Sequence, residues 1–78
     1  MGMYSLLQWQ RLVNKLFIKY YGISINDTVF CEMNYTKHYW CDCTRPYQAV
    51  NEWADKYDLR RLDSIDNSLN ETDELSVK

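Results

Sequence analysis

The stretch TVFCEMNYTKHYWCDC, residues 28–43, decides which fold this chain can adopt. It opens with β-branched and aromatic residues, which favour a strand. Apolar and polar side chains then alternate on both sides of the short polar break TKH. This alternation predicts a β-hairpin with strands near residues 28–34 and 39–43. The break lacks the Asn-Gly or Asp-Gly pair of tight hairpin turns, so a helix over residues 26–36 is the competing interpretation.

The two faces of such a hairpin would differ in chemistry. One face carries the cysteines among apolar residues: Val29, Cys31, Met33, Tyr39, Cys41 and Cys43. We expect this face to pack inward, because a reduced cysteine behaves as a small hydrophobic residue. The other face then exposes two aromatic and two acidic residues: Phe30, Trp40, Glu32 and Asp42. Exposed aromatics dominate protein interfaces, so these four residues are the predicted partner-binding patch. The reverse orientation, with the aromatic face covered and the thiols exposed, fits the pattern equally well.

An amphipathic helix is predicted on the N-terminal side of this stretch, over residues 4–21. Its apolar positions recur at helical spacing: Leu6, Trp9, Val13, Leu16, Phe17 and Tyr20. Ser5 can cap its start, and Gly22 suits the left-handed residue that ends many helices.

A second helix is predicted on the C-terminal side, over residues 45–58. Thr44 is a natural N-cap, and Pro46 fits the first turn, where its missing N–H costs nothing. Its buried stripe would be formed by four residues: Val50, Trp53, Ala54 and Tyr57.

The predicted architecture is therefore α+β, in the order helix, β-hairpin, helix. We expect one compact domain over residues 1–62 and an acidic, partly disordered tail over 63–78. Leu62, Ile65 and Leu69 keep helical spacing and could form a weak third helix. The core should draw on both helices and the hairpin: Leu6, Trp9, Val13, Phe17, Val29, Cys31, Trp53 and Tyr57.

Charge is distributed unevenly along the 78 residues, although the net charge is only −2. Residues 1–26 carry Arg11, Lys15 and Lys19 and no acidic residue. These three cations share one helix face and could serve a small nucleic-acid-binding regulator, which is the alternative function. An overall acidic chain without a recognisable nucleic-acid-binding motif makes nucleic acid the weaker prediction.

The residues Cys31, His38, Cys41 and Cys43 have the right chemistry for a zinc site but the wrong spacing. A Cys-x-Cys pair in a strand separates its side chains by about 7 Å, which is wide for one shared ion. We therefore expect no metal and no cofactor. Cys43, just before the second helix, is the one candidate for a redox role. A chain with two glycines and no evident cleft offers little for catalysis, so we expect no enzyme and no catalytic residue.

The sequence shows no export signal and no apolar run long enough to span a membrane, which predicts a cytoplasmic protein. The chain resembles the small early proteins of bacteriophages over residues 1–69. The resemblance lies in its many aromatic residues, the absence of an evident cleft and the acidic tail. That resemblance is one of general character and transfers no functional residue. It implies a non-enzymatic inhibitor or modulator that binds a host or cellular protein, in the host cytoplasm if phage-encoded. A homodimer through the aromatic patch is a compatible outcome.

Overall fold

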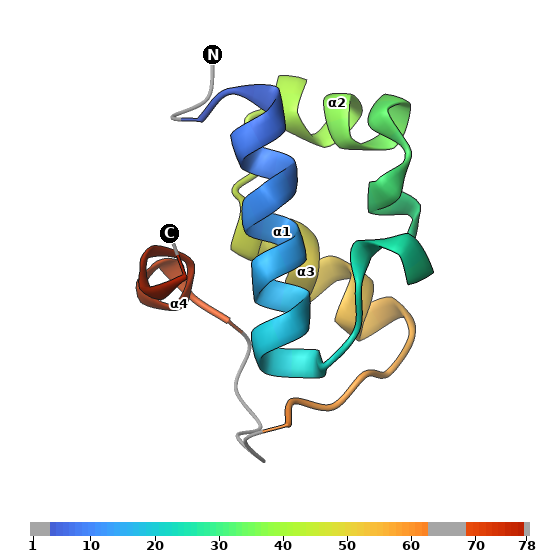
Figure 1. Cartoon of the computed structure of the whole chain (residues 1–78), viewed down its shortest axis with the longest axis vertical. Helices are drawn as coiled ribbons and strands as arrows, with labels where there is room; N and C mark the ends of the chain where they lie inside the picture. The colour runs from blue at the N-terminus through green and yellow to red at the C-terminus, as the bar shows by residue number, and fades with distance from the viewer. Residues whose placement is uncertain (1–3, 63–68, 78) are drawn as a thin grey trace.

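The computed structural model describes residues 4–62 and 69–77, and the regular elements in this part of the chain are all helices, joined by loops. The elements follow in the order α1 (Leu6–Tyr21), η1 (Ile25–Asp27), η2 (Val29–Cys31), α2 (Met33–Cys41), α3 (Pro46–Lys56) and α4 (Glu71–Ser76), where η marks a single 3₁₀ turn (Figure 1). The predicted α+β class is therefore wrong, because the residues expected to form a hairpin form η2 and α2.

Helix α1 is the element that the sequence predicts best. The Ser5 hydroxyl accepts a hydrogen bond from the Gln8 N–H at 3.2 Å, and the Gln8 side chain accepts one from the Ser5 N–H at 3.1 Å. Gly22 ends the helix with φ +68°. The buried side chains lie on one stripe: Trp9, Leu12, Val13, Leu16, Phe17 and Tyr20. Leu6, predicted to be buried, lies at the edge of this stripe and is half-buried.

Two threonine hydroxyls explain why the stretch after α1 is helical. The hydroxyl of Thr28 accepts a hydrogen bond from the Phe30 N–H at 3.1 Å, which starts the turn η2. The hydroxyl of Thr36 donates to the Phe30 carbonyl at 2.8 Å, and Thr36 is fully buried. Such local bonds from threonine compete with strand pairing. The competing prediction of a helix over residues 26–36 also misplaces the element, since α2 begins at Met33.

The burial pattern around α2 reverses the predicted orientation of the hairpin faces. Phe30 is 1% exposed and lies in the core, whereas Cys31, Cys41 and Cys43 are all exposed. Trp40 is half-buried, with its indole N–H donating to the Tyr4 carbonyl at 2.8 Å. The exposed Phe30–Trp40 patch and the inward-facing thiols are therefore both wrong. Because the segment is helical, residues 30, 36 and 40 lie toward α1, and the alternation of a strand does not predict this.

Helix α3 confirms the second predicted helix, but its N-cap and its buried residues differ from those predicted. Pro46 occupies its first turn as expected, but the N-cap is Arg45 in place of Thr44. The buried residues on this helix are Pro46, Ala49, Val50 and Ala54. Of the remaining predicted stripe, Trp53 is half-buried and Tyr57 is 50% exposed. The predicted core is therefore confirmed only in part: Trp9, Val13 and Phe17 are buried, Leu6, Val29 and Trp53 are half-buried, and Cys31 and Tyr57 are exposed.

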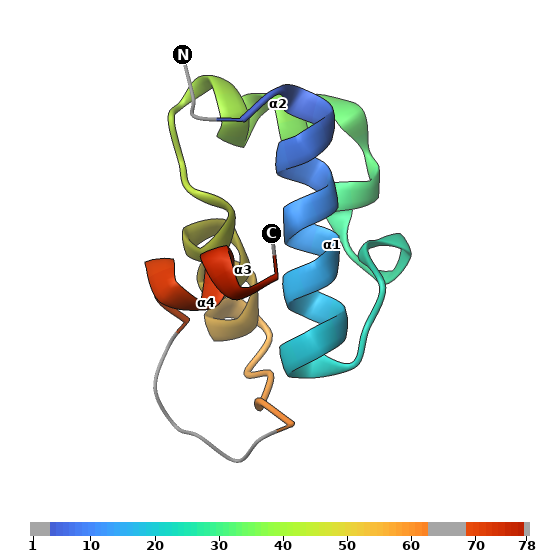
Figure 2. The same cartoon turned by 60° about the vertical axis from the view of Figure 1, so that its left-hand side comes forward.

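Helix α4 lies against α1 and α3, on the opposite side of α1 from η1 and η2 (Figures 1 and 2). Residues 63–68 lie outside the described part of the chain, so the division into a domain 1–62 and a tail 63–78 stays a prediction. Ile65 of the predicted weak helix falls in that range. In residues 69–77, Leu69 is 3% exposed and Glu74 is fully buried, so this part of the tail is packed against the body. No helix in the described residues is both long and apolar enough to cross a membrane.

Candidate protein-binding surface

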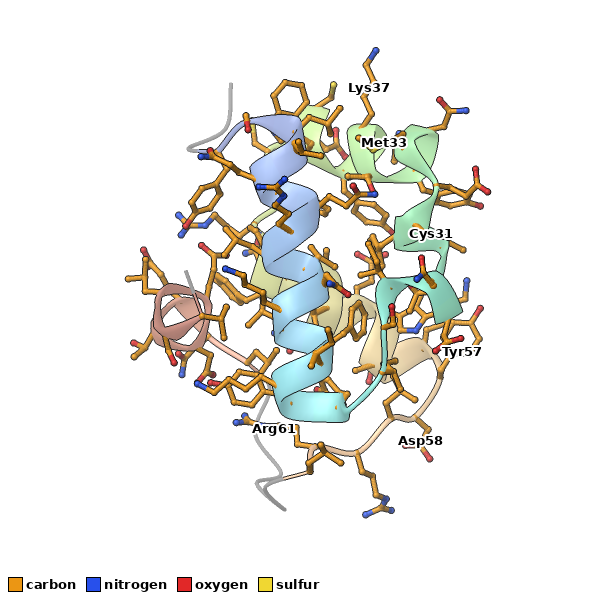
Figure 3. The ribbon with its side chains drawn as sticks, in the orientation of Figure 1. Cys31, Met33, Lys37, Tyr57, Asp58 and Arg61 are labelled. Carbon is orange, nitrogen blue, oxygen red and sulfur yellow. The ribbon has the colours of Figure 1, made fainter. Side chains whose placement is uncertain are left out.

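Four aromatic residues, two of α2, one of α3 and the C-cap of α3, form the candidate binding surface. We call Tyr35, Tyr39, Trp53 and Tyr57 the aromatic surface. Tyr35 is 52% exposed and Tyr57 is 50% exposed, while Tyr39 and Trp53 are half-buried. Two of its rings are thus open to solvent, and the other two are partly fixed in the body of the protein. Figure 3 shows Tyr57 at the side of the molecule away from α4, together with Cys31.

The buried ring of Phe30 joins the two halves of the aromatic surface. Its centroid lies 5.4 Å from that of Tyr39 and 5.9 Å from that of Trp53. Trp53 in turn lies 4.3 Å from Tyr57. From the other side, Trp9 of α1 stacks on Tyr39 at 6.4 Å with an interplanar angle of 15°. Tilted and edge-on ring contacts of this kind are favourable beyond the area that they bury.

Hydrogen bonds between distant segments hold α2 in place. The Trp9 indole N–H donates to the Thr44 carbonyl at 2.7 Å, in the loop between α2 and α3. The Gln10 side-chain amide donates to the Phe30 carbonyl at 2.9 Å, just before α2 begins. Together with the Trp40–Tyr4 bond described above, these contacts anchor both ends of α2 to α1 and its N-terminal approach. These hydrogen bonds fix the position of α2 against α1 without any partner present.

Charged groups border the aromatic surface on the α3 side. The Tyr39 hydroxyl donates to a Glu52 carboxylate oxygen at 3.1 Å. Burial, and then this hydrogen bond, raise the pKa of Tyr39 above its ordinary value, so its hydroxyl stays protonated at neutral pH. The Lys56 ammonium lies 5.6 Å from the centre of the Tyr57 ring, within range of a cation–π contact. The surface is thus apolar in the middle and charged at its margin.

The structure does not bring the four predicted patch residues together. Glu32 is the N-cap of α2 and Asp42 its C-cap, so these exposed acids stand at opposite ends of the helix. Phe30 and Trp40 contribute to the core and to the anchoring of α2 as described. Sequence reasoning missed the aromatic surface, although its signal was present. Tyr35 and Tyr39 are four residues apart, as are Trp53 and Tyr57, and this spacing puts side chains on one helix face.

The structure also does not gather the cysteines and His38 into a metal centre. In residues 4–62 and 69–77, no group of three or more His, Cys, Asp or Glu side chains is arranged to hold an ion. Cys31 donates from its thiol to the Thr28 carbonyl at 3.2 Å. Cys43, the redox candidate, has φ +60° in the loop before α3. The absence of a bound metal stays a prediction.

The basic face of α1 lies where the sequence places it. Arg11, Lys15 and Lys19 are all exposed. Lys19 donates from its ammonium to the Ser76 hydroxyl at 2.8 Å and lies 5.3 Å from the centre of the Tyr20 ring. Part of this face therefore contacts α4. Nothing in the described residues links the three cations to the aromatic surface.

A small helical domain that presents aromatic rings to solvent has the features of a protein-binding domain. The family comparison agrees: residues 7–77 match the family described as CbtA_toxin of type IV toxin-antitoxin system, and the chain belongs to this family. A toxin of this type acts by binding cellular proteins, which fits an inhibitor of a cellular protein. The resemblance to bacteriophage early inhibitors is therefore wrong, because the family is one of bacterial toxins. No solved structure matches the chain.

Proposed function

We propose that this toxin-family chain inhibits its cellular target by binding the target through the aromatic surface. The observation that carries the proposal is the pairing of two half-exposed tyrosines, Tyr35 and Tyr57, with two rings that are already locked in place. Tyrosine supplies a large amphipathic contact area with only two rotatable bonds, so it loses little conformational entropy on binding. A preorganised framework lowers the cost of association further.

The proposal sets a scale for the effect of removing one exposed ring. Truncating a hot-spot aromatic at a buried interface costs about 2 kcal/mol or more of binding free energy. At about 1.4 kcal/mol per factor of ten, this corresponds to roughly a 30-fold loss of affinity. Because the rings of Tyr35 and Tyr57 are about half exposed in the free protein, removing either one should have little effect on folding.

Inhibition by binding alone, without catalysis or cofactor, is part of the proposal. It rests on the sequence, which offers no nucleophile paired with a base in a recognisable motif. A binding inhibitor saturates when one chain is present per target molecule, whereas an enzyme inactivates an excess of target. Titration of the inhibited activity against chain concentration distinguishes these outcomes.

The test in cells uses growth inhibition on induced expression in a bacterium. Tyr35→Ala and Tyr57→Ala should each weaken growth inhibition, and the double variant should abolish it at equal expression level. Leu7→Ala and Ile18→Ala are matched controls, because both residues are about half exposed but lie on α1 outside the aromatic surface. The controls should remain toxic. If the double variant arrests growth like the unmodified chain, the aromatic surface is not the inhibitory site.

The same assay separates the nucleic-acid alternative. Reversing the charge of Arg11 and Lys15 leaves the aromatic surface untouched. Under our proposal this double variant stays toxic. Loss of toxicity in the charge-reversal variant, with full toxicity in the tyrosine variant, would assign the function to the basic face of α1.

A further inference from the structure

The carboxylate of Glu74 in α4 is the most completely enclosed charged group in the described part of the chain, with no exposed surface. Three donors converge on it. The Tyr4 hydroxyl donates to Oε2 at 2.8 Å, and Arg45 Nη2 donates to the same oxygen at 2.6 Å. The backbone N–H of Tyr47 donates to Oε1 at 3.3 Å. All three donors belong to the body of the protein, outside α4.

A second anchor holds the segment that leads into α4. The side-chain amide of Asn51 donates to the Leu69 carbonyl at 2.8 Å and accepts from the Leu69 N–H at 2.8 Å. Both bonds are made to the backbone of Leu69, and the Leu69 side chain is 3% exposed and packs in the core. Tyr4, Arg45, Tyr47 and Asn51 thus form one receptor for residues 69–77, and we call these four residues the acidic-segment dock.

Within α4 itself the attachment to the dock is polar, whereas Leu69 before the helix and Val77 after it pack against the hydrophobic core. Glu74 is the only fully buried residue of this helix, and its Leu75 is 50% exposed. A six-residue helix has little stability in isolation, so α4 depends on these contacts. A buried ion pair contributes little net stability compared with an apolar contact, because both charges must be desolvated. Losing the carboxylate would leave the Arg45 charge without its buried partner, so the contacts that hold α4 select for an acidic residue at position 74.

The dock also matches its ligand in charge. Arg45 faces both Glu74 and Glu71, and the Glu71 carboxylate lies 3.6 Å from Arg45 Nη2. The hydrogen bond to Glu74 is the main cause that raises the pKa of the Arg45 guanidinium. The Nε of Arg45 is buried and has no hydrogen-bond partner among the described residues.

We propose that the acidic-segment dock is a second binding site, which accepts an acidic helical segment of a partner protein, and that the chain's own residues 69–77 occupy it as an internal competitor. The ligand pattern is a leucine followed five residues later by a glutamate, as in Leu69 and Glu74, with an acidic first turn. The site is separate from the aromatic surface, so this inference does not rest on the proposed function.

The experiment measures binding of a fluorescent peptide, LNETDELSV, which copies residues 69–77. The full chain should bind it weakly, because the resident segment competes. Leu69→Ala and Glu74→Gln each weaken the resident segment and leave the dock intact, so both variants should bind the peptide at least tenfold more tightly. Adding Arg45→Met to either variant should abolish this gain. A peptide with glutamine in place of its last glutamate is the matched ligand control and should not bind.

Three results would overturn the proposal. The first is that both tail variants remain folded by circular dichroism and bind the peptide no better than the unmodified chain. The second is that both tail variants lose their fold, which would make α4 an integral part of the domain. The third is that Tyr35→Ala and Tyr57→Ala, placed in the Glu74→Gln background, remove peptide binding, which would place the peptide on the aromatic surface. If only one of the two tail variants folds, the peptide affinity of that variant decides whether the proposal holds.

Discussion

Replacing Phe30 with alanine tests the packing that joins α1, η2, α2 and α3. Phe30 is 1% exposed, and the ring centroids of Trp9, Phe17, Tyr39 and Trp53 lie 5.4–6.2 Å from its own. Truncating a phenylalanine in such a site costs about 3–5 kcal/mol, from lost burial and from the cavity that remains. A domain of 78 residues has a total unfolding free energy of roughly 4–12 kcal/mol. The substitution should therefore remove a large part of the stability.

The assay is urea denaturation followed by circular dichroism, with thermal melting as a second measurement. A loss of 3–5 kcal/mol corresponds to a fall in melting temperature of more than about 12 °C in a domain of this size. Tyr35→Ala is the control, because its ring is about half exposed and it should change the unfolding free energy by no more than about 0.5 kcal/mol. If Phe30→Ala costs less than about 1 kcal/mol, Phe30 lies on the surface and the packing described here is refuted.

Three further perturbations have expected outcomes. Gly22→Ala should destabilise the fold by about 1–2 kcal/mol, because φ at this position is +68° and the new Cβ would lie 3.1 Å from Leu62 Cδ1. An unchanged unfolding free energy in chemical denaturation would contradict the assigned turn. Burial, and then the hydrogen bond to Glu74, raise the pKa of Tyr4 above its ordinary value of 10.0. The stability that this shift contributes is complete below pH 10.0 and is lost as the pH rises through the raised value. Tyr4→Phe should therefore flatten the alkaline fall in melting temperature, and equal slopes for the two proteins would refute this. The three cysteines are exposed, so an aromatic disulfide reagent should label all of them in the native state, with Cys31 slowest because its thiol bonds to the Thr28 carbonyl; a thiol that reacts only in urea would contradict this placement.

The sequence predicts α1 closely because several independent signals agree there. The cap at Ser5, the apolar stripe and the glycine at position 22 each point to the same bounds. Pro46 plays a similar role for α3, where it marks the first turn. These are local signals that tertiary packing does not override.

The hairpin prediction fails because a short apolar run satisfies two periods at once. Residues 29–35 alternate as a strand would, yet Thr36, Tyr39 and Trp40 recur at the three- and four-residue spacing of a helix. The decision between these patterns depends on contacts with α1, including the bond from Gln10 to the Phe30 carbonyl, which the sequence does not display. The acidic-segment dock was missed for a related reason, since Tyr4 and Glu74 are 70 residues apart in the chain.

Site-specific photo-crosslinking in bacterial cells tests most directly whether the aromatic surface contacts the target. A photoreactive phenylalanine analogue replaces Tyr35 or Tyr57 in turn, and Ile18 on the exposed side of α1 serves as the control position. Our account predicts that the two aromatic-surface positions give the same single protein adduct and that the Ile18 position does not. An adduct from the Ile18 position, with none from Tyr35 or Tyr57, would contradict the account.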